Sequence, residues 1–81
     1  MFYTDYPFVE LGDKPGEKAP TRKVRIIRYD GNKYVDILVG GILTSVKCGY
    51  IYKENLEETP HYTIATIADI MAAIEEYTNG S

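Results

Sequence analysis

Three residue types are scarce in this chain of 81 residues, which has one cysteine, one histidine and no tryptophan. The single cysteine, Cys48, excludes a disulfide within these residues and a metal site built from several cysteines. Scarce cysteine also suits a reducing compartment, so we expect a cytoplasmic protein. The start of the chain lacks the basic residues and apolar run of a secretory signal. No stretch approaches the roughly 18 apolar residues of a membrane helix, so we expect no association with membranes.

Residues that carry catalysis or bind metal ions are equally sparse. Cys48 and His61 are the one pair that could act as nucleophile and base. Strand periodicity places Cys48 on an apolar face, where a small buried thiol is common. Adjacent carboxylates such as Glu75 and Glu76 diverge by about 100° on a helix. No phosphate-binding glycine motif is present. The sequence therefore predicts a protein that is not an enzyme and binds no cofactor, metal ion or small-molecule substrate.

Charge is unevenly distributed along the chain, although the net charge is only −3. All nine Lys and Arg lie in residues 14–53 together with three acidic residues, which gives this segment a net charge of +6. Residues 1–13 contribute −3 and residues 54–81 contribute −6. The pattern fits an anion-binding middle segment, or acidic flanks that fold back and neutralise it.

Apolar and aromatic runs separated by turn signals predict three antiparallel strands, at about 22–29, 33–39 and 42–52. The pair Gly40-Gly41 suits a two-residue hairpin, because glycine adopts positive φ without strain. That turn pairs Val39 with Ile42. The upstream turn is predicted to be a two-residue loop at Gly31-Asn32 or a four-residue loop at 30–33, and both pair Tyr29 with Tyr34 and Ile26 with Ile37. A turn at Asp30-Gly31 is the alternative, which moves the partners by two and leaves every side chain on the same face.

The two predicted hairpins place the same side chains on one apolar face, because side chains alternate across a strand. This face comprises Val24, Ile26, Val35, Ile37, Val39, Ile42, Val46 and Cys48. The opposite face is mixed, with basic and aromatic residues toward one end and Leu38 paired with Leu43 at the other. It comprises Lys23, Arg25, Ile27, Tyr29, Tyr34, Asp36, Leu38, Leu43, Ser45 and Lys47.

A C-terminal helix at about 64–78 is predicted to cover the apolar face. Its apolar residues recur at spacings of three and four, which gives one stripe. Thr66 with Asp69 resembles a capping box, and Thr63 is an alternative cap. The stripe comprises Ile67, Ile70, Met71, Ile74 and Tyr77.

The predicted fold class is α+β, a single domain over residues 1–81 in which a three-stranded antiparallel meander packs against one helix. It consists of an arm and loop at 1–21, the meander at 22–52 and the helix within 63–78. Residues 1–13 suit either an edge strand or an arm.

Binding is the predicted function, because eight of the 81 residues are tyrosines and tyrosine suits interfaces. The expected partner is another protein or a second copy of the chain. Single-stranded nucleic acid is the alternative, since bases stack on sheet-face aromatics beside basic side chains; the acidic net charge opposes it. Size and composition also resemble accessory proteins of phages and mobile elements. The candidate partner-binding residues are Lys23, Arg25, Tyr29, Tyr34, Leu38, Leu43 and Lys47.

Overall fold

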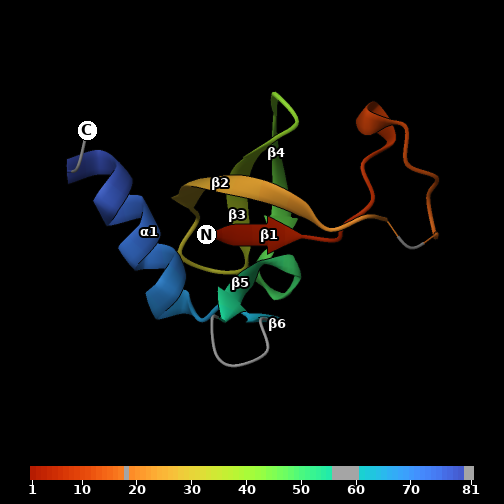
Figure 1. Cartoon of the computed structure of the whole chain (residues 1–81). Helices are drawn as coiled ribbons and strands as arrows, with labels where there is room; N and C mark the ends of the chain where they lie inside the picture. The colour runs from red at the N-terminus through yellow and green to blue at the C-terminus, as the bar shows by residue number, and fades with distance from the viewer. Residues whose placement is uncertain (18, 56–60, 80–81) are drawn as a thin grey trace.

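The computed structural model describes residues 1–17, 19–55 and 61–79, which form one antiparallel sheet and one C-terminal helix (Figure 1). Among these residues, no helix has the length and hydropathy needed to cross a membrane. Two 3₁₀ turns interrupt the connections, η1 (Val9–Leu11) and η2 (Cys48–Tyr50). The remaining elements are β1 (Phe2–Thr4), β2 (Arg22–Tyr29), β3 (Tyr34–Val39), β4 (Ile42–Lys47), β5 (Tyr52–Asn55), β6 (His61–Ile64) and α1 (Ile67–Asn79).

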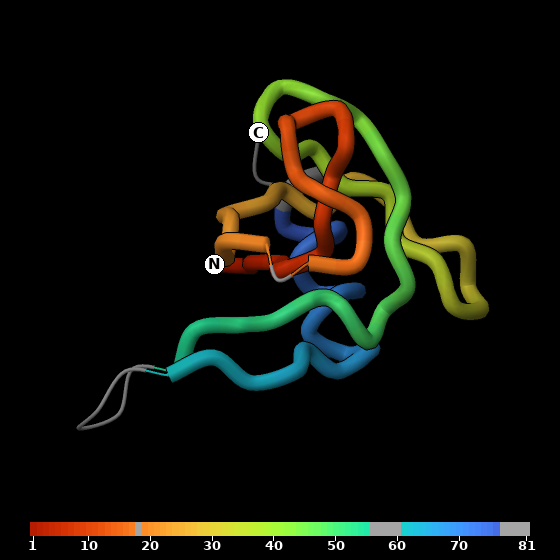
Figure 2. Tube along the Cα trace, turned by 90° about the vertical axis from the view of Figure 1, so that its right-hand side faces the viewer, coloured from red at the N-terminus to blue at the C-terminus, as the bar shows by residue number. Residues whose placement is uncertain are grey.

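The sheet has six strands in the order β4-β3-β2-β1-β5-β6. The N-terminal segment therefore supplies an inner strand, since β1 pairs antiparallel with β2 on one side and with β5 on the other. The short β1 lies across the front of the molecule in Figure 1, and the β5–β6 hairpin projects as a separate arm of the trace in Figure 2. The α+β class is confirmed, and the predicted three-stranded meander is too small.

Two predicted boundaries are wrong because turns interrupt the predicted elements. The strand predicted at 42–52 ends at Lys47, where η2 turns the chain before β5 begins. The helix predicted from residue 64 begins at Ile67, and residues 61–64 form β6 instead. The capping box fixes this start: the Asp69 N–H donates to Thr66 Oγ1 (3.1 Å), and the Thr66 N–H donates to Asp69 Oδ2 (2.9 Å). Thr63 is therefore not the cap, and its β-branched side chain suits the strand.

The β3–β4 hairpin has the predicted register. Val39 pairs with Ile42, and Val35 pairs with Val46. Gly40 and Gly41 have φ values of 56° and 81°, which glycine adopts without a steric cost. The predicted apolar face is the core face: six of its members are buried, and Cys48 is partly buried against them. The buried members are Val24, Ile26, Val35, Ile37, Val39 and Val46.

The β2–β3 hairpin departs from the predicted register because β2 is irregular between Ile26 and Arg28. Ile26 pairs with Ile37 as predicted, but Tyr29 pairs with Val35 rather than with Tyr34. One extra residue on β2 moves the following side chains to the opposite faces. Tyr29 consequently packs against the core, and Arg28 lies beside Asp36 with 3.9 Å between Nε and Oδ2.

The turn chemistry accounts for this register. Asp30 Oδ1 accepts the backbone N–H groups of Asn32, Lys33 and Tyr34 at 2.7–3.1 Å. A side chain that satisfies three consecutive donors holds a three-residue loop rather than the predicted two- or four-residue loop. The Asp30 N–H then donates to the Tyr34 carbonyl at 3.1 Å. An odd loop length is what shifts Tyr29 by one residue.

Tyr29 and Tyr34 are therefore expected to differ in their contribution to stability. Tyr29→Ala removes a ring packed against the core and should lower the free energy of unfolding by about 2–3 kcal/mol. Tyr34→Ala removes an exposed ring and should cost about 0.5 kcal/mol. Urea unfolding of the two variants measures this difference. Equal losses would support the Tyr29–Tyr34 pairing and contradict the irregular β2.

Helix α1 packs on the core side of the sheet through a narrower stripe than the sequence predicts. Ile70 is fully buried, and Ile74 packs against the core cluster. Ile67 and Met71 are 46% and 50% exposed, so their predicted place in the buried stripe is wrong. The side chain of Tyr77 lies outside the described part of the structure.

Two ion pairs join the acidic flanks to the basic middle segment. The Arg22 guanidinium binds Asp13, and Lys53 Nζ lies 3.0 Å from Asp69 Oδ2 on α1. Of the two explanations for the charge pattern, these contacts favour flanks that fold back and neutralise part of the middle segment.

Candidate functional site

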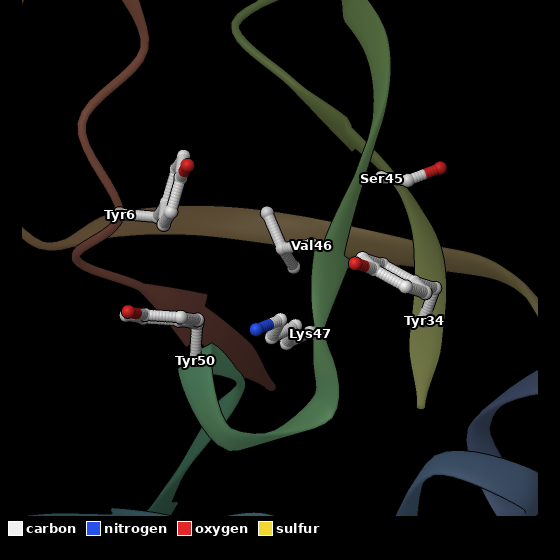
Figure 3. Close-up of a pocket in the computed structure, with 6 residues that line it drawn as sticks. All are labelled: Tyr6, Tyr34, Ser45, Val46, Lys47 and Tyr50. Atoms are coloured by element: carbon white, nitrogen blue, oxygen red, sulfur yellow. The ribbon is translucent and has the colours of Figure 1, made fainter. Parts of the chain in front are cut away.

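A hollow of about 180 Å³ lies beside the edge strand β4 (Figure 3). Four elements contribute to it. The β1–β2 loop brings Tyr6, β3 brings Tyr34, β4 brings three residues and η2 brings Tyr50. In Figure 3, Tyr6 and Tyr50 stand on one side of β4, and the Lys47 ammonium extends toward Tyr50. The lining residues are Tyr6, Tyr34, Ser45, Val46, Lys47 and Tyr50.

The tyrosine rings of the hollow are packed and yet accessible. Tyr6 and Tyr50 meet edge to face, with 5.0 Å between ring centroids and an interplanar angle of 79°. The Tyr6 ring also lies 5.5 Å from that of Phe8, which is buried. Tyr6, Tyr34 and Tyr50 nevertheless remain 38–41% exposed. The rings therefore present apolar surface that already has a fixed arrangement, which lowers the entropic cost of binding.

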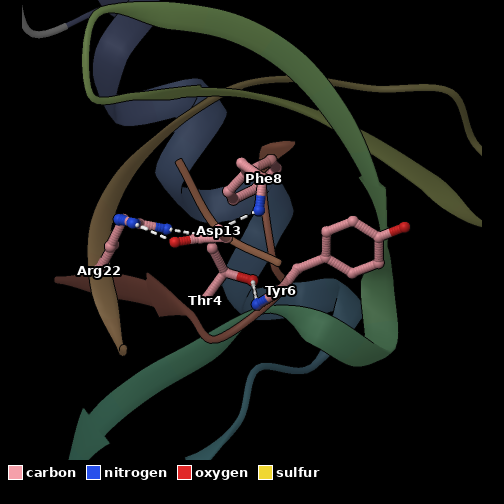
Figure 4. A network of polar contacts seen from close by, with 5 residues as sticks. All are labelled: Thr4, Tyr6, Phe8, Asp13 and Arg22. Carbon is pink, nitrogen blue, oxygen red and sulfur yellow. Dashed lines mark hydrogen bonds and ion pairs between the residues drawn. The ribbon is translucent and has the colours of Figure 1, made fainter. Parts of the chain in front are cut away.

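A polar network in the β1–β2 loop positions Tyr6 (Figure 4). The Tyr6 N–H donates to Oγ1 of the fully buried Thr4 at 3.2 Å. Two residues on, the Phe8 N–H donates to Asp13 Oδ2 at 2.8 Å. Arg22, at the start of β2, donates two hydrogen bonds to the same carboxylate, and one of its nitrogens lies 2.7 Å from Oδ1. This fork joins the loop to the sheet, because the paired geometry of guanidinium and carboxylate restricts both groups.

These contacts change the acidity of Asp13. Hydrogen bonds from Arg22, and secondarily from the Phe8 N–H, lower the pKa of the Asp13 carboxyl from 3.8 to about 2. Asp69 is similar, because the Thr66 N–H and then Lys53 lower its pKa to about 2. Both carboxylates are therefore stabilised in their ionised form by the fold.

Acid is expected to weaken the protein through these two groups. A lowered pKa contributes stability that is present above the unfolded value near pH 4 and is lost as the pH falls toward about 2. The free energy of unfolding should decline over this range, and Asp13→Asn or Asp69→Asn should remove part of the decline. Urea unfolding between pH 7 and pH 2 provides the measurement. A decline that both variants leave unchanged would contradict the role assigned to these carboxylates.

The polar groups that line the hollow are four hydroxyls and one ammonium. They are three tyrosine hydroxyls, the Lys47 ammonium and the Ser45 hydroxyl, which donates to the Asp36 carboxylate. An ammonium only donates, whereas a hydroxyl both donates and accepts. Among the described residues that line the hollow there is no carboxylate or imidazole. The described residues contain no group of three or more His, Cys, Asp or Glu placed to hold a metal ion. The arrangement offers rings and donors to a ligand.

Cys48 and His61, the catalytic pair considered from the sequence, are outside this hollow. Cys48 is partly buried against the core. Burial raises the pKa of its thiol, which reduces the thiolate available for nucleophilic attack. The packing therefore suits a structural cysteine.

The structure separates the predicted partner-binding residues into four groups. Tyr34 and Lys47 pair directly across β3 and β4 and line the hollow. Arg25, Leu38 and Leu43 form a row further along the outer face, beyond the Asp36–Ser45 pair, since Leu38 pairs with both of the others. Lys23 pairs with Tyr3 of β1. Tyr29 is turned toward the core, so its predicted place on this face is wrong.

Tyr6 and Tyr50 belong to the hollow and were not predicted as site residues. Tyr6 follows the short strand β1, whose position depends on long-range pairing with β5. Tyr50 lies within the short turn η2. The abundance of tyrosine in the first residues is the one local signal that pointed toward Tyr6.

No protein-family model matches the chain, and no curated protein or solved structure is significantly similar to it. The geometry of the hollow is therefore the basis for a proposed function.

Proposed function

We propose that the protein is a small, non-enzymatic binding module that docks a segment of a partner protein in the hollow. The observation that carries this proposal is the set of three half-exposed tyrosines beside Lys47, two of which, Tyr6 and Tyr50, pack edge to face. A tyrosine buries a large apolar ring while its hydroxyl keeps a polar contact, and it orders only two side-chain torsions on binding. Such residues are among those that dominate the energy of protein interfaces.

The tyrosine hydroxyls and the Lys47 ammonium determine which chemical groups a partner segment would supply. Main-chain carbonyls or a carboxylate of the partner would accept from the tyrosine hydroxyls, and Lys47 favours a negatively charged side chain. The neighbouring exposed pair of Leu38 and Leu43 would extend the contact with apolar area along β3 and β4. We therefore expect the partner segment to have an acidic group beside Lys47 and an apolar portion beside the leucine pair.

Single-stranded nucleic acid is less well supported as the ligand. The predicted stacking platform combined Tyr29 with Tyr34, and the register of β2 turns Tyr29 toward the core. Lys23 and Arg25 lie on β2 rather than among the residues that line the hollow. Tyr34 and Lys47 alone offer one ring and one cation.

Charge reversal at Lys47 provides the test. The wild-type protein captures its partner from a lysate of cells that contain the native gene, and the captured protein is purified and titrated by anisotropy. Lys47→Glu should weaken this binding at least about tenfold, because it places a like charge against the acceptors. Lys33→Glu, a charge reversal at an exposed turn residue, serves as the control and should leave the affinity within about twofold.

A purified partner that binds Lys47→Glu and the wild type equally would overturn the proposal. Binding of labelled single-stranded DNA or RNA that weakens as salt rises, with no protein captured, would instead favour the nucleic-acid alternative.

A further inference from the structure

The sheet ends in two edge strands, β4 and β6, and they differ in how they are protected from pairing. Natural edges are often blunted by lysine, proline or an irregular register. β4 ends in Lys47, which lies at the hollow. β6 reads His-Tyr-Thr-Ile and contains no lysine, arginine, proline or carboxylate, and its register with β5 is regular. β6 therefore has none of these protective features.

The direction of the unpaired main-chain groups on β6 follows from one contact. The Ala65 N–H donates to the Ile51 carbonyl at 2.9 Å, so the main chain of Ala65 faces β5. Successive residues of an antiparallel strand direct their N–H and C=O groups to opposite sides. Thr63 consequently faces β5 as well, whereas Tyr62 and Ile64 direct their main-chain groups to the open edge.

We infer that two copies of the chain pair antiparallel through β6, about a two-fold axis at Thr63. In this register Tyr62 lies opposite Ile64 of the second copy, and Ile64 lies opposite Tyr62 of the second copy. Each such pair exchanges two N–H to C=O hydrogen bonds, because these residues have outward main-chain groups. A shift by one residue would align outward groups with inward ones and lose the hydrogen bonds.

The side chains of β6 complement one another in the same register. Tyr62 and Ile64 share the outer face of the sheet and are 49% and 58% exposed. Pairing sets an aromatic ring against a β-branched side chain on each side of the axis, which is a favourable cross-strand combination. The Tyr62 ring is already held against Tyr3, with 4.7 Å between centroids.

Thr63 adds an independent observation. Its Oγ1 atom is buried and has no hydrogen-bond partner among the described residues, and an unsatisfied buried hydroxyl is unfavourable. On the two-fold axis each Thr63 faces Thr63 of the second copy as a non-hydrogen-bonded pair, where the side chains are closest. Because Oγ1 is enclosed by its own chain, a rotation about χ1 of Thr63 would bring the hydroxyl to this position, where paired threonines hydrogen-bond.

Charge permits this pairing. Beside Thr63 on β5 lies Lys53, whose ammonium is neutralised by Asp69 at 3.0 Å. Beside Tyr62 lies Glu54, which accepts a hydrogen bond from the Tyr3 hydroxyl at 3.2 Å. The four residues of β6 include no Lys, Arg, Asp or Glu, so no charge of these types lies on the paired strands themselves.

The resulting dimer is expected to be weak and dependent on concentration, because four-residue strands form an interface at the small end of the size range, under about 1,200 Å². β6 and the β4 strand of the hollow are at opposite ends of the strand order. The dimer therefore goes beyond the docking function and would carry two hollows.

Disulfide trapping tests the register. In a Cys48→Ser background, Thr63→Cys should form a covalent dimer under mild oxidation, since opposed Cα atoms about 4.5 Å apart suit a disulfide. Leu43→Cys on the edge strand β4 is the control. The leucine is 66% exposed, so a cysteine at this position would form disulfides readily through random collisions between chains. The expected rate for Thr63→Cys is at least about tenfold higher. Equal rates, or a slower Thr63→Cys, would overturn the inference.

Sedimentation of the unmodified chain provides a second measurement. The wild type should shift from monomer toward dimer as its concentration rises to the millimolar range, and Ile64→Lys should stay monomeric because edge lysines oppose pairing. A wild type that stays monomeric throughout, or an Ile64→Lys that dimerises equally, would overturn the inference. Partner binding at the hollow is measured separately at micromolar concentration, so either proposal can fail alone.

Discussion

Ile70→Ala is expected to lower the free energy of unfolding by about 2–5 kcal/mol, the usual cost of truncating a fully buried isoleucine. Ile70 is 0% exposed and belongs to the one described helix that covers the core face. Its removal leaves a cavity between α1 and the core cluster, which includes residues of β2, and interior packing does not readily fill it. A domain of this size has a total stability of about 5–10 kcal/mol, so this single change should remove a large share of it.

Ile67→Ala is the matched control for this prediction. It deletes the same atoms from the same helix, one turn earlier, at a side chain that is 46% exposed. The expected loss is below about 1 kcal/mol. Thermal and urea unfolding of both variants measure the difference. Similar losses would show that the helix is rotated relative to the sheet, with Ile67 sharing the buried stripe as the periodicity alone predicts.

Tyr50→Ala is expected to weaken partner binding by about 30-fold or more, which corresponds to about 2 kcal/mol. Tyr50 contributes its own ring to the hollow and also supports the ring of Tyr6 across a 5.0 Å contact. The variant therefore loses contact area and the fixed position of a second tyrosine. Tyr50→Phe keeps both rings and loses one donor, so it should cost only about fivefold to tenfold.

Tyr62→Ala is the control for the binding experiment. Tyr62 is as exposed as Tyr50 but lies on β6, at the other end of the sheet. At micromolar protein concentration it should leave the affinity for the partner unchanged within about twofold. Titrations followed by fluorescence anisotropy of the labelled partner give the affinities. A larger loss from Tyr62→Ala than from Tyr50→Ala would locate the partner on β6 rather than in the hollow.

The local parts of the fold were predictable from the sequence because their signals are local. Two glycines define the β3–β4 turn, and this turn fixes the register through Val39 and Ile42. Alternation along β3 and β4 then identified the core face. The helix was recognised by its spacing, while its first turn was misplaced because the capping box at Thr66 competed with an earlier threonine.

Some of the missed parts depend on contacts between distant segments. β1 has only three residues, and its place between β2 and β5 is decided by pairing with residues 22–24 and 52–53. Such short strands have no periodicity that a sequence reveals. The irregularity in β2 was missed for a local reason: three N–H groups converge on the Asp30 carboxylate, and the turn residues alone are compatible with several loop lengths.

The candidate site contains some residues that local sequence signals predict and others that they do not. Tyr34 and Lys47 were predicted together because they flank one hairpin, and the structure pairs them. Tyr6 reaches the hollow only through the Asp13–Arg22 fork and the buried Thr4, and Tyr50 reaches it through η2. The contact that assembles the hollow joins Tyr6 to Tyr50, which are far apart along the chain, so sequence spacing alone contained no sign of it.

The docking role of the hollow is tested most directly by mapping the bound partner on the isotope-labelled protein with two-dimensional amide NMR. The account predicts that addition of the purified partner shifts the amide signals of Tyr6, Tyr34, Ser45, Lys47 and Tyr50 most strongly. It also predicts that Lys47→Glu abolishes these shifts while the remaining spectrum stays native. Shifts confined to β2 or β6, with the signals of the hollow unchanged, would contradict the account.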